Sequence, residues 1–482
     1  MASVKINVLL NGINTVTSIL FPIITFPYAA RVLLPEGIGV INFQLSVINY
    51  IVLLTSLGIP LYAVKEIASF RDNQIDRDKA TFEIILLSVL LCLVGYVGVW
   101  LLAEFVPQIH QQSALFYILS LTILFNAIGV NWFYQGIEDF KFITYRAIII
   151  RTLSALSLFI FVHSTSDLLI YGVICVGSTV GNNVINFVHL RKYLHFSHFP
   201  IKELNIIRHI RPACQVFVLN LIISLYIQLN SIMLGFMAGD DAVGYFAAGT
   251  KISHIGLILI SSLGTVMLPR CSHLIETGKF EQFANTIRKS ARFIVALSLP
   301  MIAGLMILAT PITLIFCGKD FIDSIPILYL NAPVIILIGL TNVMGLQILY
   351  PMGKVNIVIW SVSCGAIVNI LLNLILIPIY SAVGAAISTL FSELAVYVVQ
   401  IIAGKKYYPF SWDSIFQIRY FIATLIMSIC IYIECCLISD TLLQIIVSIF
   451  SGMTIYGLAL YAFNDDLVKE VLKFISNLIK RK

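Results

Sequence analysis

The chain has 482 residues, of which 59% are hydrophobic and 11% are charged, and its mean hydropathy is +0.98. Soluble domains carry about 25% charged residues, so this composition excludes a soluble protein. The net charge of +6 does not indicate nucleic-acid binding, because the basic residues gather in the connections on one side of the apolar segments.

Fourteen apolar segments are long enough to cross a bilayer, since a spanning helix needs about 20 residues. Their length, and the lack of the ten-residue alternation of barrel strands, predict an all-α integral membrane protein. In chain order the predicted spans are 8–32, 38–62, 81–103, 114–135, 142–162, 168–189, 213–238, 244–268, 293–316, 325–350, 355–378, 382–403, 419–438 and 441–463.

The basic residues predict the orientation of these spans. With the amino terminus in the cytoplasm, 25 of the 30 basic residues fall in cytoplasmic connections, and the outer connections hold only Lys319 against eight acidic residues. This asymmetry follows the positive-inside rule. It predicts fourteen spans with both termini in the cytoplasm.

A long, polar cytoplasmic connection predicts the boundary between two halves of the chain. We expect an N-terminal lobe of six spans (1–190), an inter-lobe linker (191–212), a C-terminal lobe of six spans (213–403), two extra helices (404–463) and a cytoplasmic tail (464–482). A short internal repeat supports two halves, because residues 35–40 (PEGIGV) and 240–245 (DDAVGY) occupy the same topological position. Six predicted helices separate the copies, so the repeats would be parallel.

Four cations lie inside predicted spans: Arg31, Arg146, Arg151 and Lys251. A charge at membrane depth costs about 2.5–3.5 kcal/mol on insertion scales, so such residues usually face a partner or a watery cavity. Arg146 is near the cytoplasmic start of its span and is expected to snorkel to the interface, which is also an alternative for Arg31 near an outer end. Arg31, Arg151 and Lys251 therefore predict a binding site for an anion.

Span 1 also carries Asn11 and Asn14, which share a helix face and either line a cavity or bond a neighbouring helix. Glu66 with Lys65 and Arg71 is interpreted first as an interfacial ion pair and alternatively as a gate. The two acids clearly inside apolar runs are Glu393 and Glu434, which are candidates for ion coupling. No metal-binding Cys/His spacing and no phosphate-binding P-loop occur in the sequence, so we expect no metal, no cofactor and no enzyme activity.

Three stretches of this sequence resemble one known family. Residues 21–39 (FPIITFPYAARVLLPEGIG), 57–68 (LGIPLYAVKEIA) with 71–73 (RDN), and 377–388 (IPIYSAVGAAIS) with Glu393 are similar to bacterial oligosaccharide flippases of the Wzx or O-antigen type, in the MOP exporter superfamily. The resemblance implies a MATE-like V of two six-helix lobes plus two carboxy-terminal helices. In this family Arg31 and Lys251 match positions in spans 1 and 8.

The resemblance also implies a function. The substrate would be an undecaprenyl-diphosphate-linked oligosaccharide repeat unit, moved from the cytoplasmic to the periplasmic leaflet of the bacterial inner membrane by alternating access and ion-gradient coupling. Expected partners are this lipid-linked substrate, membrane lipids, a polysaccharide polymerase and a chain-length regulator. Two alternatives remain: a multidrug or cation antiporter of the same fold, which would favour buried acids, and a membrane polysaccharide polymerase, which would favour a large outer loop.

Overall fold

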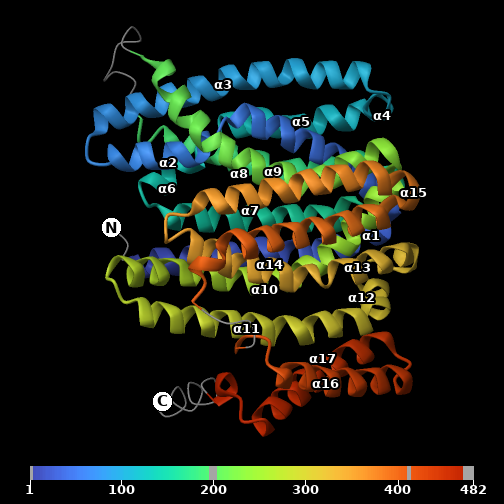
Figure 1. The fold of residues 1–482 in the computed structure, drawn as a ribbon. Coiled ribbons are helices and arrows are strands. Elements are labelled where there is room, and N and C mark those ends of the chain that lie inside the picture. Colours follow the sequence, from blue (N-terminus) through green and yellow to red (C-terminus); the bar gives the residue numbers. More distant parts are fainter. Residues whose placement is uncertain (1–3, 195–203, 410–413, 470–482) are drawn as a thin grey trace. The chain divides into compact units, whose positions relative to one another are not determined.

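The computed structural model describes residues 4–194, 204–409 and 414–469, with some side chains inside the helices left out. These ranges are helical and contain no strand (Figure 1). The α-helices are α1 (Val4–Ser56), α2 (Ile59–Ser69), α3 (Gln74–Phe105), α4 (Pro107–His110), α5 (Ser113–Ala127), α6 (Asn131–Gly136), α7 (Phe140–Phe161), α8 (Leu168–Leu190), α9 (Ile210–Met237), α10 (Asp240–Glu276), α11 (Phe280–Ile307), α12 (Ala309–Phe316), α13 (Ile325–Asn331), α14 (Val334–Asn342), α15 (Val355–Gly404), α16 (Ile418–Leu437) and α17 (Thr441–Ala462).

Helix lies along each of the fourteen predicted spans, with three notable departures from regular geometry. Spans 1 and 2 form one element, α1, which is broken at Leu34 (φ 60°). Spans 11 and 12 form α15, which is broken at Ser381 (φ 51°). A proline disfavours the α conformation of the residue before it. Leu34 stands directly before Pro35, so the helix is expected to break there. A third break separates α5 from α6, at residues 128–130.

Helix length and composition identify nine membrane-crossing helices in the described ranges, or ten when the bent pair formed by 319–331 and 334–349 counts as one span. Two of the nine, Gly12–Ser69 and Val355–Tyr407, each cover two predicted spans, and the predicted spans along α9 and α10 are not among the nine. A continuous helix of 53 residues would be about 80 Å long, whereas the hydrocarbon core is about 30 Å thick, so α1 has the length of two spans. The count of fourteen stays a prediction with which the helices agree.

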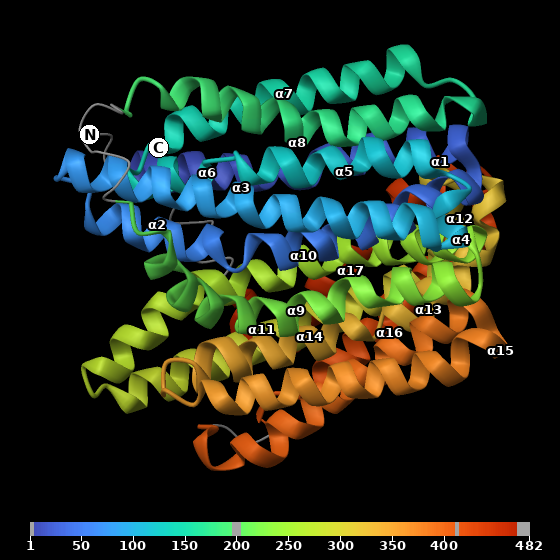
Figure 2. The same cartoon turned by 90° about the horizontal axis from the view of Figure 1, so that it is seen from above.

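The helices form two compact units, Met1–Gly244 and Tyr245–Lys482. In the first unit, α1 packs against α3, α5, α7 and α9, and α8 packs against α5 and α7 (Figures 1 and 2). In the second unit, α16 packs against α17 and α11, and α15 packs against α13 and α14. The helix α9, predicted to open the second lobe, thus belongs to the first compact unit. Packing does not show which helices move together, so the predicted lobes, linker and extra helices stay predictions. Residues 470–482 of the predicted tail lie outside the described residues.

Large apolar side chains cover the outside of many helices. Val94, Trp360, Ile402 and Leu437 are 69%, 73%, 73% and 78% exposed. Contiguous exposed apolar surface of this extent is rare on soluble monomers, where it marks a binding or membrane surface. The chain is therefore a multi-pass membrane protein whose lipid-facing residues are these exposed side chains.

The two copies of the internal repeat touch one another reciprocally. A Cβ atom added to Gly39 would lie 1.7 Å from the backbone oxygen of Asp240, and one added to Gly244 would lie 2.1 Å from the backbone oxygen of Pro35. Pro35 corresponds to Asp240 and Gly39 to Gly244 in the repeat, so the contact has the self-complementary form that a two-fold relation produces. Only glycine permits this approach of the two backbones.

Replacing Gly39 or Gly244 by alanine should therefore destabilise the protein. The added methyl group has to move backbone rather than a flexible side chain, which we expect to cost about 1–3 kcal/mol, the range of overpacked cores. Thermal unfolding of the detergent-solubilised variants measures this loss. Gly12→Ala, also on α1, is the control, because a Cβ at Gly12 meets nothing within 4 Å. Equal melting temperatures for all three variants would contradict the assigned contact.

Candidate functional site

Arg151 on α7 is held by the polar first part of α1. Its Nη1 atom donates to the backbone oxygen and the Oδ1 atom of Asn14, both at 3.0 Å, and to the Oγ1 atom of Thr17 at 2.8 Å. The side chain is half-buried. The structure thus brings together two residues, Asn14 and Arg151, that the sequence predicts as substrate-binding. The side chain of Asn11, a third candidate, lies outside the described residues.

Arg146, on the same helix, does not snorkel, so that expectation is wrong. It is only 7% exposed, and it donates from Nε to Asn182 Oδ1 at 3.0 Å and from Nη2 to Asn131 Oδ1 at 3.3 Å. The two asparagines come from α8 and α6, and their oxygens replace the water that snorkelling would have supplied. Within the described residues, Nη1 of Arg146 is buried and has no hydrogen-bond partner.

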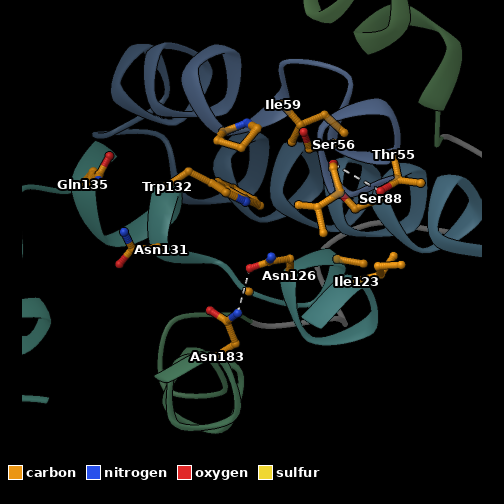
Figure 3. Close-up of a pocket in the computed structure, with 14 residues that line it drawn as sticks. Thr55, Ser56, Ile59, Ser88, Ile123, Asn126, Asn131, Trp132, Gln135 and Asn183 are labelled. Carbon is orange, nitrogen blue, oxygen red and sulfur yellow. Dashed lines mark hydrogen bonds between the residues drawn. The ribbon is translucent and has the colours of Figure 1, made fainter. Parts of the chain in front are cut away.

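A pocket of about 290 Å³, lined by both polar and apolar side chains, lies beside this arginine (Figure 3); we call it the polar pocket for its amide and hydroxyl groups. Its lining includes the side chains Thr55, Ser56, Ser88, Asn126, Asn131, Trp132, Gln135 and Asn183. Asn131 therefore contacts both the pocket and Arg146. Asn126 and Asn183 point toward one another, and Asn183 Nδ2 donates to Asn126 Oδ1 at 3.0 Å.

The break between α5 and α6 creates much of this pocket. Asn126 is the next-to-last residue of the first helix and Asn131 is the first of the second. Gly129 between them faces Asn183, whose Oδ1 atom would be 2.5 Å from an added Cβ. Irregular backbone at membrane depth is tolerated where it is buried in protein or lines a cavity, and broken helices form the binding sites of many transporters. Amide and hydroxyl groups beside an aromatic ring can bind a hydroxyl-rich ligand in such a pocket.

The two remaining predicted cations lie in different units. Arg31 is exposed on α1, one helical turn before the break at Leu34. Lys251 is half-buried on α10, in the second unit. Next to it, Thr250 Oγ1 accepts from Asn331 Nδ2 at 3.3 Å. Both cations stay predicted substrate contacts.

Of the predicted acids, Glu434 accepts a hydrogen bond from Ser451 Oγ at 2.7 Å, which links α16 to α17. Glu393 on α15 is 7% exposed. Glu66 on α2 is half-buried, and Lys65 beside it is exposed. Arg71 pairs with Glu138 at 3.1 Å. The coupling and gating roles of these residues stay predictions.

Sequence reasoning missed a charged network around Glu83, which is fully buried on α3. Its carboxylate accepts from Arg208 Nε and His209 Nε2, both at 2.8 Å, and from the backbone nitrogen of Asn205 at 2.7 Å. The Nδ1 atom of His209 lies 2.7 Å from the hydroxyl of Tyr62 on α2. These contacts fix the start of α9 to α2 and α3. The partners are 122–126 residues apart in the chain, so no local pattern could reveal them.

Burial makes His209 a pH-sensitive part of this network. The side chain is fully buried, and burial lowers its pKa below the usual 6.5, helped by the charge of Arg208 and opposed by Glu83 and Glu66. Because the folded pKa is lowered, the stabilising contribution is present above pH 6.5 and is lost as the pH falls through the folded pKa.

Melting temperature of the solubilised protein should therefore fall between pH 7 and 5 more steeply in the wild type than in His209→Gln, which keeps hydrogen-bonding groups but does not titrate. His163→Gln, in the loop before α8, is the matched control and should keep the wild-type slope, because His163 is exposed. Parallel slopes for wild type and His209→Gln would contradict the role of His209.

Buried cations, a polar pocket and broken spans within a lipid-facing helical bundle define a membrane transporter. The sequence matches the family model described as "Polysaccharide biosynthesis protein" over residues 4–275, more than half of the chain, so the chain belongs to this family. It is 26% identical over 404 residues to the "Putative O-antigen transporter" of Escherichia coli strain K12, covering 82% of this chain and 95% of that protein.

Solved structures show the same fold. The lipid II flippase MurJ in an inward closed conformation superposes with a TM-score of 0.76 at 16% identity, covering 96% of this chain and 100% of that one. An inward-facing MATE multidrug resistance transporter of the MOP superfamily gives 0.63 at 14% identity, covering 80% and 93%. The predicted all-α, MATE-like membrane fold and the predicted family are thus confirmed.

Proposed function

We propose that the protein is a flippase that moves an undecaprenyl-diphosphate-linked oligosaccharide repeat unit from the cytoplasmic to the periplasmic leaflet, for O-antigen or another surface polysaccharide. The observation that carries the proposal is the set of neutral partners around two arginines in a predicted span. Within the described residues, the hydrogen bonds of Arg146 and Arg151 go to asparagine, threonine and backbone oxygens, and none goes to a carboxylate. Their charges remain available to an anion.

A diphosphate matches this chemistry. Arginine presents a planar set of donors that suits phosphate oxygens, and hydrogen bonds to charged groups contribute about 1.5–3 kcal/mol each. The buried Nη1 atom of Arg146 lacks a partner in the described part of the chain, so it is a donor that a phosphate oxygen would satisfy. We propose Arg151 and Arg146 as diphosphate contacts, with Asn14 positioning Arg151, and we keep Arg31 on α1 and Lys251 on α10 as separate proposed substrate contacts.

The polar pocket supports the sugar part of the substrate. Hydroxyl groups of a sugar both donate and accept, as the amides of Asn126, Asn131 and Gln135 do, and Trp132 supplies an apolar ring at the same pocket. One relative is named a "Putative O-antigen transporter" and another, in Bacillus subtilis, a "Lipid II flippase". Their names describe transporters, which favours transport over a polymerase activity.

A cation antiporter of the same fold has less support. Such a protein needs buried acids with spare charge. The fully buried Glu83 is compensated by Arg208, whose Nη2 atom lies 2.6 Å from it, so the buried Glu393 is the acid that an antiporter would use. For ion coupling we propose Glu66, since it interacts with Tyr62, which joins the His209–Glu83 network.

The proposed location is the bacterial inner membrane, with both termini in the cytoplasm. A polysaccharide polymerase and a chain-length regulator would act on the repeat unit after it has been moved.

Arg151→Ala should abolish surface-polysaccharide export, because it removes a donor to the diphosphate, and Arg151→Lys should keep partial export, because the charge remains. Arg31→Ala and Lys251→Ala should also lower export, by at least tenfold for a lost charged hydrogen bond of about 1.4 kcal/mol or more. Export is measured as surface polysaccharide in a knockout strain complemented with each variant at equal protein level. Lys141→Ala, an exposed cation on the same helix as Arg151, is the control.

In the knockout strain itself, the lipid-linked repeat unit should accumulate on the cytoplasmic leaflet, where a membrane-impermeant enzyme acting from the outside cannot reach it. Normal export by all alanine variants would contradict the assigned contacts. A knockout in which the repeat unit still reaches the periplasmic leaflet would contradict the flippase function itself.

A further inference from the structure

A second polar pocket, of about 380 Å³, lies in the second unit and has a different character. It is formed by the first part of α11, the start of α16 and the segment that follows α17. Its charged lining consists of five basic residues, Arg288, Lys289, Arg292, Arg419 and Lys469, and two acidic ones, Asp465 and Asp466. None of these residues belongs to the proposed substrate contacts.

Two of the arginines are anchored through Nε. Arg292 Nε donates to the backbone oxygen of Ser414 at 2.7 Å, and Arg419 Nε lies 2.9 Å from Oδ2 of the fully buried Asp465. Across the described part of the chain, the terminal nitrogens of these two guanidinium groups have no hydrogen-bond partner, and neither does Arg288. The anchoring thus leaves the terminal nitrogens of both guanidinium groups without a partner among the residues that the structure describes.

Among the described lining residues, positive charge is therefore in excess, with five basic side chains against two acidic ones. Arg288 and Arg292 are four residues apart on α11 and share one helix face. Asp465 is already engaged by Arg419 and by the backbone nitrogen of Leu467, at 2.8 Å from Oδ1. Like charges held this close repel one another, so a bound anion would relieve a cost that the empty pocket carries.

We propose that this pocket binds the phosphate group of an anionic phospholipid. Guanidinium groups held by Nε present their two terminal nitrogens together, which is the geometry for bidentate contact with phosphate. The pocket lies at the ends of α11 and α16, which are both long and apolar enough to cross a membrane. Ile418, next to Arg419, is 72% exposed, so apolar surface adjoins the pocket. Basic pockets between spanning helices on the cytoplasmic side bind anionic headgroups in this way.

Free inorganic phosphate shares the headgroup chemistry but lacks the acyl chains, so the test separates the two sources. Full-length protein is purified in detergent, stripped of lipid, and titrated in native mass spectrometry with phosphatidylglycerol, cardiolipin, phosphatidylethanolamine or inorganic phosphate. We expect retention of phosphatidylglycerol and cardiolipin at concentrations where phosphatidylethanolamine and inorganic phosphate are lost.

Arg288→Gln and Arg292→Gln should each weaken retention of the anionic lipids by about tenfold, the effect of one lost charged hydrogen bond of about 1.4 kcal/mol. Arg288→Gln removes no hydrogen bond or ion pair within the described residues, so we expect it to keep the fold, which an unchanged melting temperature would show. Arg270→Gln, an exposed cation on α10 outside the pocket, is the control and should bind as the wild type does.

Wild-type retention by both pocket variants would overturn the proposal, and so would equal retention of phosphatidylethanolamine. Binding of inorganic phosphate without lipid preference, lost in Arg288→Gln, would overturn the lipid assignment. Lipid retention does not involve transport, so these outcomes are independent of the proposed flippase function.

Discussion

The constraint on which the first unit depends is the cost of a guanidinium group at membrane depth. Arg146 meets it with two asparagine oxygens, from α6 and α8, and Arg151 meets it with Asn14 and Thr17 on α1. Both arginines lie on α7, so their partners tie that helix to three others. The same contacts place polar groups around the pocket between α5, α6 and α8. The hydrogen bonds that hold the two arginines thus come from the same helices that line the polar pocket.

Breaks in the helices make this arrangement possible. The interruption at residues 128–130 turns the chain between Asn126 and Asn131 and lets Asn183 approach Gly129. The break at Leu34 precedes the segment in which Gly39 and Gly244 bring the two repeat copies into backbone contact. In a membrane such breaks are stable only where protein or water satisfies the freed backbone groups, so they coincide with polar or closely packed regions.

The sequence predicts the helices well because span length and the distribution of basic residues are local properties. It also places Arg151 and Asn14 among the candidates, since a charge or an amide in an apolar run is visible without a structure. It fails for Arg146, where proximity to a helix end suggested snorkelling, because the partners Asn131 and Asn182 lie on other helices. It misses Glu83 and His209, which look like ordinary interfacial residues until folding brings them together across 126 residues.

The two kinds of buried charge in the first unit serve different purposes. Glu83 is neutralised by Arg208 and bonded by His209, and removing one partner of such a pair leaves an uncompensated charge, so this network holds the start of α9 in place. Arg146 and Arg151 are oriented by neutral oxygens that fix geometry without cancelling charge. Under the proposed function, an anion bound there would gain contacts without having to displace a carboxylate. It would also be able to leave again, because the neutral partners keep the arginines satisfied in part, and a carrier that releases its substrate on the other side needs that reversibility.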